Sequence, residues 1–137
     1  MNTVFLVQTC GLALYEFMED VSLCPPHEAN GLLTLFVQHT SASSLIQENA
    51  NPEVQRDLDA FFKRLVPSAN NVQMFYLRQT CAGPHDMPAH IKAALLPTSL
   101  SIPVSNGKLC FGRWQGVYLF EQQDARQWRS VRAHLSQ

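Results

Sequence analysis

The chain has 137 residues, of which 46% are hydrophobic and 15% charged, as is typical of one globular domain. Ten basic side chains nearly balance eleven acidic ones, so no basic surface for nucleic acid is indicated. No apolar run reaches the roughly 18 residues of a membrane helix, and the N-terminus lacks the basic start of a signal peptide. We therefore expect a cytoplasmic protein that binds neither nucleic acid nor membranes, and the sparse charge favours self-association.

The first half of the chain contains three predicted strands. In residues 3–9, apolar and polar side chains alternate and several are β-branched, which predicts a strand. Residues 12–23 are ambiguous and allow a short helix. Residues 24–31 are rich in turn formers. Residues 32–38 form the most apolar segment, which predicts a central strand, and residues 45–46 continue the sheet.

A helix is predicted after residue 50. Asn51 is a good N-cap, Pro52 fits the first helical position, and Pro67 ends the helix. Apolar residues recur at helical spacing and predict a stripe that faces a core. They are Val54, Leu58, Phe61, Phe62 and Leu65.

The second half contains a second helix over residues 88–96 and a hairpin at residues 105–108, where Asn-Gly suits a tight turn. The strands expected here are residues 72–77, 99–104, 117–121 and 129–135. The whole pattern predicts a single α+β domain over residues 1–137. Its sheet is mostly antiparallel, in a sandwich-like arrangement with about two helices.

The four cysteines, Cys10, Cys24, Cys81 and Cys110, show no metal-binding spacing. We expect reduced, partly buried thiols rather than disulfides.

Polar clusters interrupt this apolar chain at two places with histidines. Residues 38–44 follow a predicted buried strand, where His39 belongs either to a site or to a hydrogen-bonded loop. The second cluster has two imidazoles and a carboxylate in residues 85–90. It is either a divalent-metal site or the start of a surface helix with Asp86 as its cap.

A third cluster is the stretch from Gly112 to Gly116. Its two glycines indicate either a backbone that passes close to another group or a tight bulge between strands. Arg113 offers either a fork for phosphate or a salt bridge, and the salt bridge is favoured. Neither a Walker loop nor a GxGxxG motif occurs, so no nucleotide cofactor is expected.

Taken together, these clusters resemble the YjbQ-like family over nearly the whole chain. The matching stretches are residues 38–43, 48–52, 56–58, 86–92 and 112–116. The resemblance implies a compact α+β domain that assembles as a homotrimer, with sites near subunit boundaries. It also implies a secondary thiamine-phosphate synthase activity, which joins hydroxymethylpyrimidine diphosphate to thiazole phosphate. The implied partner is thus a small phosphorylated molecule, and the implied cofactor is a divalent metal, Zn²⁺ or Mg²⁺.

The resemblance also selects candidate site residues, and their roles follow from side-chain chemistry. The candidate metal ligands are His39, Asp86 and His90. The candidate catalytic residues are Glu48, His90, Lys92 and Gln115. Those proposed to bind the small molecule are Asn49, Arg113 and Trp114. Among them, Lys92 would face phosphate oxygens, and Glu48 would act as a base or orient a histidine.

Three positions depart from the family pattern: the segment 79–83, Arg113 and Pro97. The segment 79–83 lacks the histidine and acidic residues that many relatives carry there. This loss favours an alternative function, a non-enzymatic trimer that binds a small ligand or a metal. A metal-dependent hydrolase is a further alternative, because a pocket of histidine and aspartate can activate water.

Overall fold

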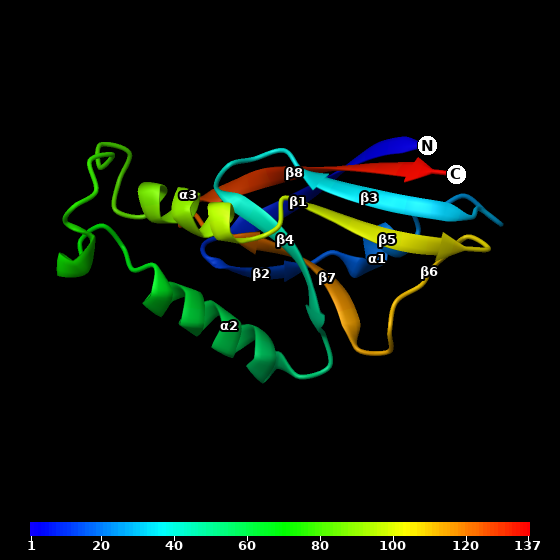
Figure 1. The fold of residues 1–137 in the computed structure, drawn as a ribbon, viewed down its shortest axis with the longest axis horizontal. Coiled ribbons are helices and arrows are strands. Elements are labelled where there is room, and N and C mark those ends of the chain that lie inside the picture. The colour runs from blue at the N-terminus through cyan, green and yellow to red at the C-terminus, as the bar shows by residue number, and fades with distance from the viewer.

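A computed structural model describes all 137 residues, and its strands form two antiparallel sheets (Figure 1). The strands are β1 (Asn2–Cys10), β2 (Ala13–Glu16), β3 (Gly31–Val37), β4 (Ala42–Glu48), β5 (Ser99–Ser105), β6 (Lys108–Leu109), β7 (Gln115–Glu121) and β8 (Arg126–Ser136). The larger sheet has the order β1-β8-β3-β5-β6, and the smaller has the order β2-β7-β4. The helices are α1 (Met18–Ser22), α2 (Pro52–Leu65) and α3 (Asp86–Leu95). The expected α+β class with antiparallel sheets is therefore confirmed, with three helices rather than about two.

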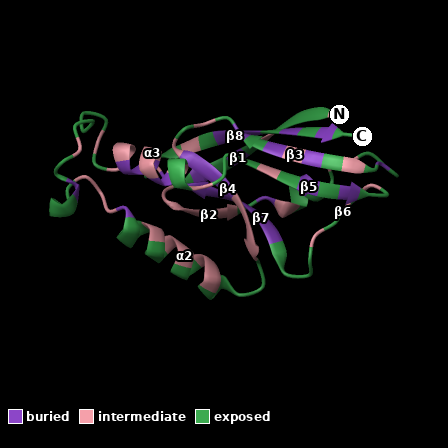
Figure 2. Ribbon diagram, viewed as in Figure 1, coloured by how far each residue is buried: buried purple, intermediate pink, exposed green.

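The core lies between the two sheets, because inward-facing apolar residues alternate along the strands. In β3, Leu33, Leu35 and Val37 are buried, and Leu32 and Phe36 on the opposite face are exposed. Figure 2 shows the buried residues concentrated in the strands, with α2 only intermediate or exposed. Two sheets with one shared core thus provide the rigid framework on which the polar clusters sit.

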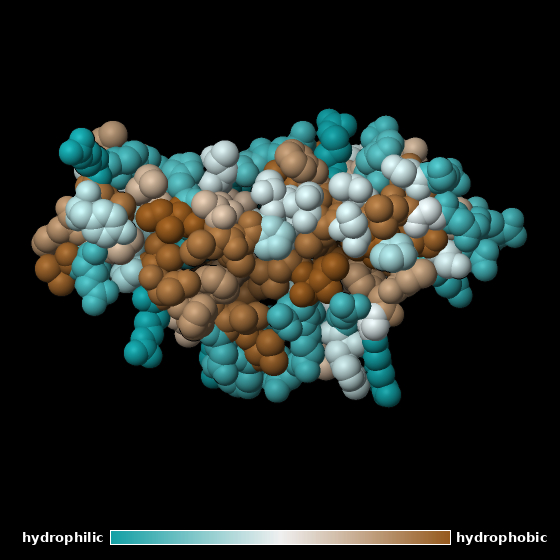
Figure 3. Space-filling view, in the orientation of Figure 1, coloured by the Kyte–Doolittle hydropathy of each residue, from teal (hydrophilic) through white to brown (hydrophobic).

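Helix α2 lies against the outer side of the smaller sheet, where the ring of Phe62 meets Phe120 edge-on with centroids 5.5 Å apart. The predicted stripe along α2 is therefore only partly covered, since Phe61 is 56% exposed and Leu65 is 52% exposed. The expectation that the whole stripe faces a core is wrong, because only one side of α2 meets the sheet. Figure 3 shows apolar surface gathered at the end of the molecule where α2 and α3 lie.

The outer face of the larger sheet carries no helix of this chain. Leu6 on β1 is 62% exposed, and Trp128 on β8 is 59% exposed. Phe36 on β3 is exposed as well. We call these three residues the open sheet face. An exposed group of large apolar side chains is typical of a contact surface.

Local sequence signals place several element ends correctly. The Asn51 side chain accepts a hydrogen bond from the Glu53 N–H at 3.0 Å, so it caps α2 as predicted. The hairpin between β5 and β6 turns through Asn106 and Gly107, with φ of 51° and 74°, as its Asn-Gly pair predicts. These positive φ values are ones that asparagine and glycine tolerate.

Other expectations are corrected. The strand predicted at residues 72–77 is a single 3₁₀ turn, Val72–Met74, started by the Asn71 side chain. The cysteines are all free, as expected, but Cys10, Cys81 and Cys110 are exposed rather than partly buried. None of the helices combines the length and the hydropathy needed to cross a membrane.

Candidate functional site

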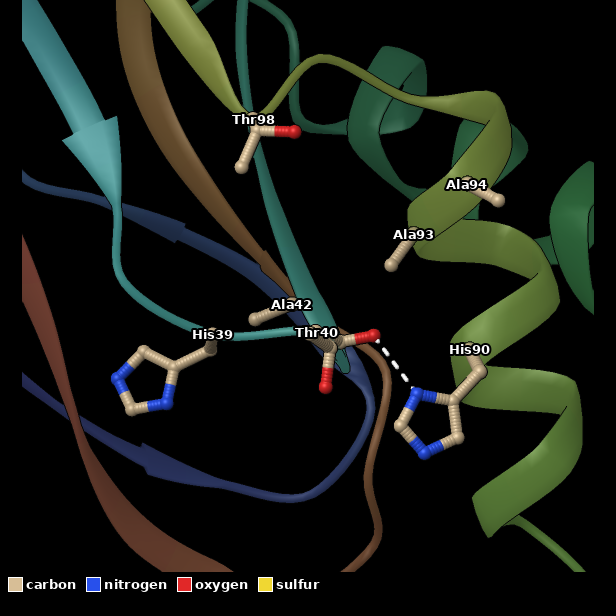
Figure 4. A pocket seen from close by; sticks show the side chains of 7 residues that line it. All are labelled: His39, Thr40, Ala42, His90, Ala93, Ala94 and Thr98. Carbon is tan, nitrogen blue, oxygen red and sulfur yellow. Dashed lines mark hydrogen bonds between the residues drawn. The ribbon is translucent and has the colours of Figure 1, made fainter.

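The first histidine cluster and the second meet at one cavity of about 290 Å³ between α3 and the connection from β3 to β4 (Figure 4). Its walls are formed by His39, Thr40, Ala42, His90, Ala93, Ala94 and Thr98. We call it the histidine cavity. Figure 4 shows the two imidazoles on opposite sides of Thr40, with the His39 ring directed away from His90. The fold therefore brings together two residues that are 51 positions apart in the sequence without bringing their rings face to face.

His39 is held by the larger sheet. Its Nε2 accepts a hydrogen bond from the Ser130 N–H at 2.9 Å, which places the ring proton on Nδ1. Burial lowers the pKa of the His39 imidazole below its ordinary value, and the Arg129 charge adds to the effect, while Glu121 opposes it. The ring is therefore neutral near pH 7 and serves as an acceptor.

His90 is held differently, between two acceptors. Its Nδ1 lies 3.0 Å from the Thr40 carbonyl oxygen, and its Nε2 lies 3.3 Å from an Asp86 carboxylate oxygen one turn earlier in α3. In the protonated ring both nitrogens would donate. The two histidines thus suit different tasks, with His39 as a neutral acceptor and His90 as a proton donor beside a carboxylate.

Asp86 is fixed by two glutamine side chains. Gln79 Nε2 donates to Oδ2 at 2.6 Å, and Gln123 Nε2 donates to Oδ1. The hydrogen bond from Gln79 lowers the pKa of the Asp86 carboxyl, and that from Gln123 lowers it further. The expectation that Asp86 caps α3 is wrong, because the cap residue is His85 and Asp86 begins the helix. The two glutamines instead hold the Asp86 carboxylate beside the His90 ring.

The candidate metal ligands do not form a metal site within one chain. No three His, Cys, Asp or Glu side chains lie close enough together to hold an ion. Asp86 and His90 are neighbours, but the Nε2 of His39 is occupied by the Ser130 N–H. A metal at this place would need ligands from elsewhere.

Lys92 does not face the histidine cavity. Two residues along a helix correspond to about 200° of rotation, so Lys92 lies on the side of α3 away from His90. The side chain is 3% exposed and directed toward α2. Burial lowers the pKa of the Lys92 ammonium, with a smaller contribution from Lys63, while Asp59 opposes the shift. It therefore cannot bind the same phosphate group that His90 contacts.

The remaining candidates lie at the other end of β4. Glu48 pairs with Gln115 in the register of β4 and β7, and the Asn49 N–H donates to the Trp114 carbonyl at 2.9 Å. The seven residues of β4 separate this group from the histidine cavity by about 20 Å. A single chain thus divides the predicted site residues into two distant groups.

The third cluster is explained largely by the chain itself. A Cβ on Gly116 would lie 2.5 Å from a carboxylate oxygen of Glu16, so the glycine permits a close approach. The Gln115 side chain accepts from the Gly112 N–H at 2.7 Å and closes the loop before β7. Arg113 stacks over the Trp114 ring, 4.7 Å from its centroid, and makes no salt bridge. The salt bridge favoured for Arg113 is therefore replaced by a cation–π contact.

Glu48 has one side-chain oxygen that is buried without a hydrogen-bond partner. Its neighbour Tyr118 donates to the Glu48 carbonyl at 3.3 Å and accepts from Gln55 at 2.8 Å. Burial, together with the nearby Glu16, raises the pKa of Tyr118 to about 12. This end of β4 therefore carries acidic side chains in a partly desolvated environment.

A buried ion pair that the sequence analysis missed supports the histidine cavity. Arg129 donates through Nε to Glu121 at 2.7 Å, and a terminal nitrogen reaches the Ser41 carbonyl at 3.1 Å. Arg129 thereby ties the larger sheet to the connection that carries His39. A glutamate and an arginine at inward positions of two strands are the signal that would have revealed this pair.

Comparisons with known proteins identify the family of the chain. A family model described as UPF0047 protein YjbQ-like matches residues 8–137. The UPF0047 protein sll1880 of Synechocystis is 42% identical over 135 residues, which is 97% of this chain and 89% of the relative. YjbQ of Escherichia coli O157:H7 is 46% identical over 91 residues, covering 66% of this chain and 62% of that protein.

Solved structures show the same fold. A conserved hypothetical protein of Thermus thermophilus, TT1486, has a TM-score of 0.85 and 28% identity, covering 98% of this chain and 99% of its own. A YjbQ/UPF0047 protein of Clostridium acetobutylicum has a TM-score of 0.78 and 26% identity, covering 98% of this chain and 99% of its own. By sequence and by fold, the chain belongs to the UPF0047 YjbQ-like family.

Proposed function

We propose that the chain binds a small phosphorylated molecule in the histidine cavity and catalyses weak thiamine-phosphate synthase chemistry. One observation supports this most. His90 lies at the cavity wall between the Thr40 carbonyl and the Asp86 carboxylate, and two glutamines fix that carboxylate. A positioned imidazole of this kind is a general acid. The choice of this reaction follows from the resemblance of the sequence motifs to those of the YjbQ-like family.

In that reaction the thiazole nitrogen attacks the methylene carbon of the pyrimidine, and the bond from this carbon to the diphosphate oxygen breaks. Negative charge develops on the departing diphosphate, so a donor placed beside it accelerates the step. The 3.3 Å contact from His90 Nε2 to Asp86 is long for a hydrogen bond. A diphosphate oxygen that enters the cavity can therefore take over this donor.

Binding of a divalent metal at Asp86 and His90 is a further part of the proposal. One chain supplies Asp86 and His90 as adjacent groups, and no third ligand joins them. These residues do not fit a metal by themselves, so no step is assigned to one. Further ligands would come from the diphosphate or from a second subunit.

The homotrimer is the second part of the proposal, with the open sheet face as the contact between copies. This face exposes Leu6, Phe36 and Trp128 in a chain of low charge. Leu6 pairs across the sheet with Ser130, whose N–H binds His39. A copy docked on this face would thus place the histidine cavity near a subunit boundary. The second group of site residues, that at Glu48, would then come from the neighbouring copy.

A non-enzymatic binding protein is the second candidate. Three of the four predicted catalytic residues lie outside the histidine cavity, namely Glu48, Lys92 and Gln115. A single chain therefore retains the means to hold a ligand, but fewer groups to neutralise a departing diphosphate.

The test is thiamine phosphate formation by the purified protein, with and without Mg²⁺ or Zn²⁺. We expect product with the wild type and a loss of about 100-fold or more in His90→Ala, the scale of one general acid. His27→Ala is the matched control, because His27 is an exposed histidine that does not line the cavity. Absence of product under every condition would contradict the synthase, and binding of the diphosphate substrate without turnover would then establish the second candidate.

A further inference from the structure

The open sheet face is basic as well as apolar. Along β8, Arg126 and Arg132 lie on the same side as Trp128, because alternate residues of a strand share one face. Both arginines are exposed and form no salt bridge. The positions of β1, β3 and β8 on this side carry no carboxylate. A partner that covers this face must therefore supply both apolar surface and negative charge.

The complementary combination occurs at α1. Residues 16–31 contain four carboxylates and neither lysine nor arginine. Beside α1 lies a cavity of about 450 Å³ whose walls include Phe5, Asp20, Leu23 and Cys24. Leu23 is 80% exposed, and Asp20 is exposed without a salt bridge. We call it the α1 cavity. It joins apolar walls to negative charge, and the chain leaves it uncovered.

The two surfaces complement each other, but they cannot meet within one chain. Trp128 is paired with Gln8 in the register of β1 and β8, whereas Thr3 lies in the wall of the α1 cavity. Five residues of β1 lead from Thr3 to Gln8, a distance of about 17 Å. An indole side chain is too short to span it. A second copy of the chain, in contrast, can bring its Trp128 ring to the cavity.

We propose that copies of the chain assemble head-to-tail, with Trp128 of one copy seated in the α1 cavity of the next. Arg126 lies two residues before Trp128 on the same face, so it reaches the rim of that cavity and pairs with Asp20 of the neighbouring copy. Tryptophan and arginine are enriched among the residues that contribute most to protein interfaces. A contact between two different surfaces generates a closed ring when its rotation closes, which is the arrangement that a trimer requires.

This contact rests on the proposed trimer and specifies how it joins the two groups of site residues. Glu16, two residues before α1, lies beside the group at Glu48. Ser130, which binds His39, follows Trp128 by two residues on the open sheet face. Docking of α1 on this face therefore brings the Glu48 group of one copy toward the histidine cavity of the next.

Sedimentation equilibrium of the purified protein and its variants tests the contact. Trp128→Ala should raise the dissociation constant of the assembly about 30-fold or more, the scale of one central interface residue. Tyr76→Ala is the matched control, because Tyr76 is an aromatic residue, 71% exposed, outside both surfaces. It should leave the dissociation constant within about twofold.

A charge swap tests the pairing of Asp20 with Arg126. Asp20→Arg and Arg126→Asp should each weaken assembly about tenfold or more, because each brings like charges together. The double variant restores opposite charges and should return to within about threefold of the wild type. Arg64→Asp is the control for charge reversal, since Arg64 is exposed on α2 outside both surfaces, and it should assemble as the wild type does.

The outcomes separate this contact from the trimer itself. A monomeric wild type contradicts both together. A trimer that persists in Trp128→Ala and in both charge reversals overturns this contact alone, and so does a double variant that assembles no better than the single ones. Should Trp128→Ala not fold, as judged by circular dichroism, Leu23→Ser changes an 80% exposed side chain on the opposite surface. It too should weaken assembly about tenfold.

Discussion

At the scale of single residues, the pair formed by Arg129 and Glu121 explains how a small protein fixes a polar cavity. Both side chains are nearly inaccessible, at 4% and 0% exposure. Glu121 also accepts from Thr9 at 2.6 Å, and Arg129 continues to the oxygens of Ser41. Because Thr9 is buried and Ser41 is partly buried, these hydrogen bonds restrain the connection that carries His39.

We predict that Glu121→Gln destabilises the fold by about 3–5 kcal/mol at pH 7, because it leaves the Arg129 charge buried and unpaired. Urea unfolding at a fixed protein concentration measures this. Glu19→Gln is the matched control, since Glu19 is exposed on α1, and it should change stability by less than about 0.5 kcal/mol. A small effect in Glu121→Gln would mean that the pair is not essential.

The pH dependence of the same pair has a definite sign. Burial by itself would raise the pKa of the Glu121 carboxyl, but hydrogen bonds from Arg129, Thr9 and the Gln123 N–H outweigh it and lower the pKa. A lowered folded-state pKa means that the stabilisation is present above the ordinary value of about 4.3 and is lost as the pH falls through the folded-state value. The stability difference between wild type and Glu121→Gln should therefore shrink below about pH 4. A difference that stays constant down to pH 3 would contradict it.

At the scale of elements, the family-like stretch of residues 48–52 combines two roles. Asn51 caps α2, and Pro52 begins the helix. Asn49 instead donates its backbone N–H to the loop before β7. Part of this stretch is therefore explained by folding, because it ends a strand and starts a helix within four residues.

We predict that Asn51→Ala destabilises the protein by about 1 kcal/mol, because the Glu53 N–H loses its acceptor. Asn51→Asp should stay close to the wild type, since it keeps an acceptor at the positive end of the helix. Thermal unfolding of the three proteins, followed by circular dichroism, measures the change. If alanine and aspartate behave alike, the cap is not what stabilises the start of α2.

The same elements show what the sequence could reveal. Asn51, Pro52, Asn106 and Gly107 act on their immediate neighbours, so their patterns located the helix and the hairpin correctly. The strand predicted at residues 72–77 is wrong, because this mostly apolar segment has no sheet edge beside it to pair with. Helix caps and turns, which depend on neighbouring residues, were thus predictable, whereas the pairing of a segment with a distant strand was not.

The candidate site was predictable in part for the same reason. His39 and His90 were recognised as polar residues in an apolar chain, and the fold places them at one cavity. The two hydrogen bonds that fix the Asp86 carboxylate could not be predicted, because one donor, Gln123, lies 37 positions away in the sequence. The direction of Lys92 follows only once α3 and its neighbours are placed.

At the scale of the whole molecule, the separation of the two polar groups at the ends of β4 and the exposure of the open sheet face have one common explanation, the assembly of several copies. Within a chain the groups are too far apart to act on one small substrate. A second copy is the simplest source of a missing group, because closed homo-oligomers repeat the same surfaces. Assembly and activity are therefore expected to depend on each other.

We predict that the wild type sediments as a trimer at micromolar concentration and that Leu6→Lys shifts it toward monomer. A lysine here places an ammonium in the apolar contact, and because Leu6 is 62% exposed in the single chain, the fold itself should tolerate the change. Phe61→Lys is the matched control on the other apolar surface, since Phe61 is 56% exposed on α2, and it should leave the trimer intact. Sedimentation velocity of the three proteins distinguishes the possibilities. A monomeric wild type would contradict the trimer, whereas dissociation by Phe61→Lys alone would move the contact to α2.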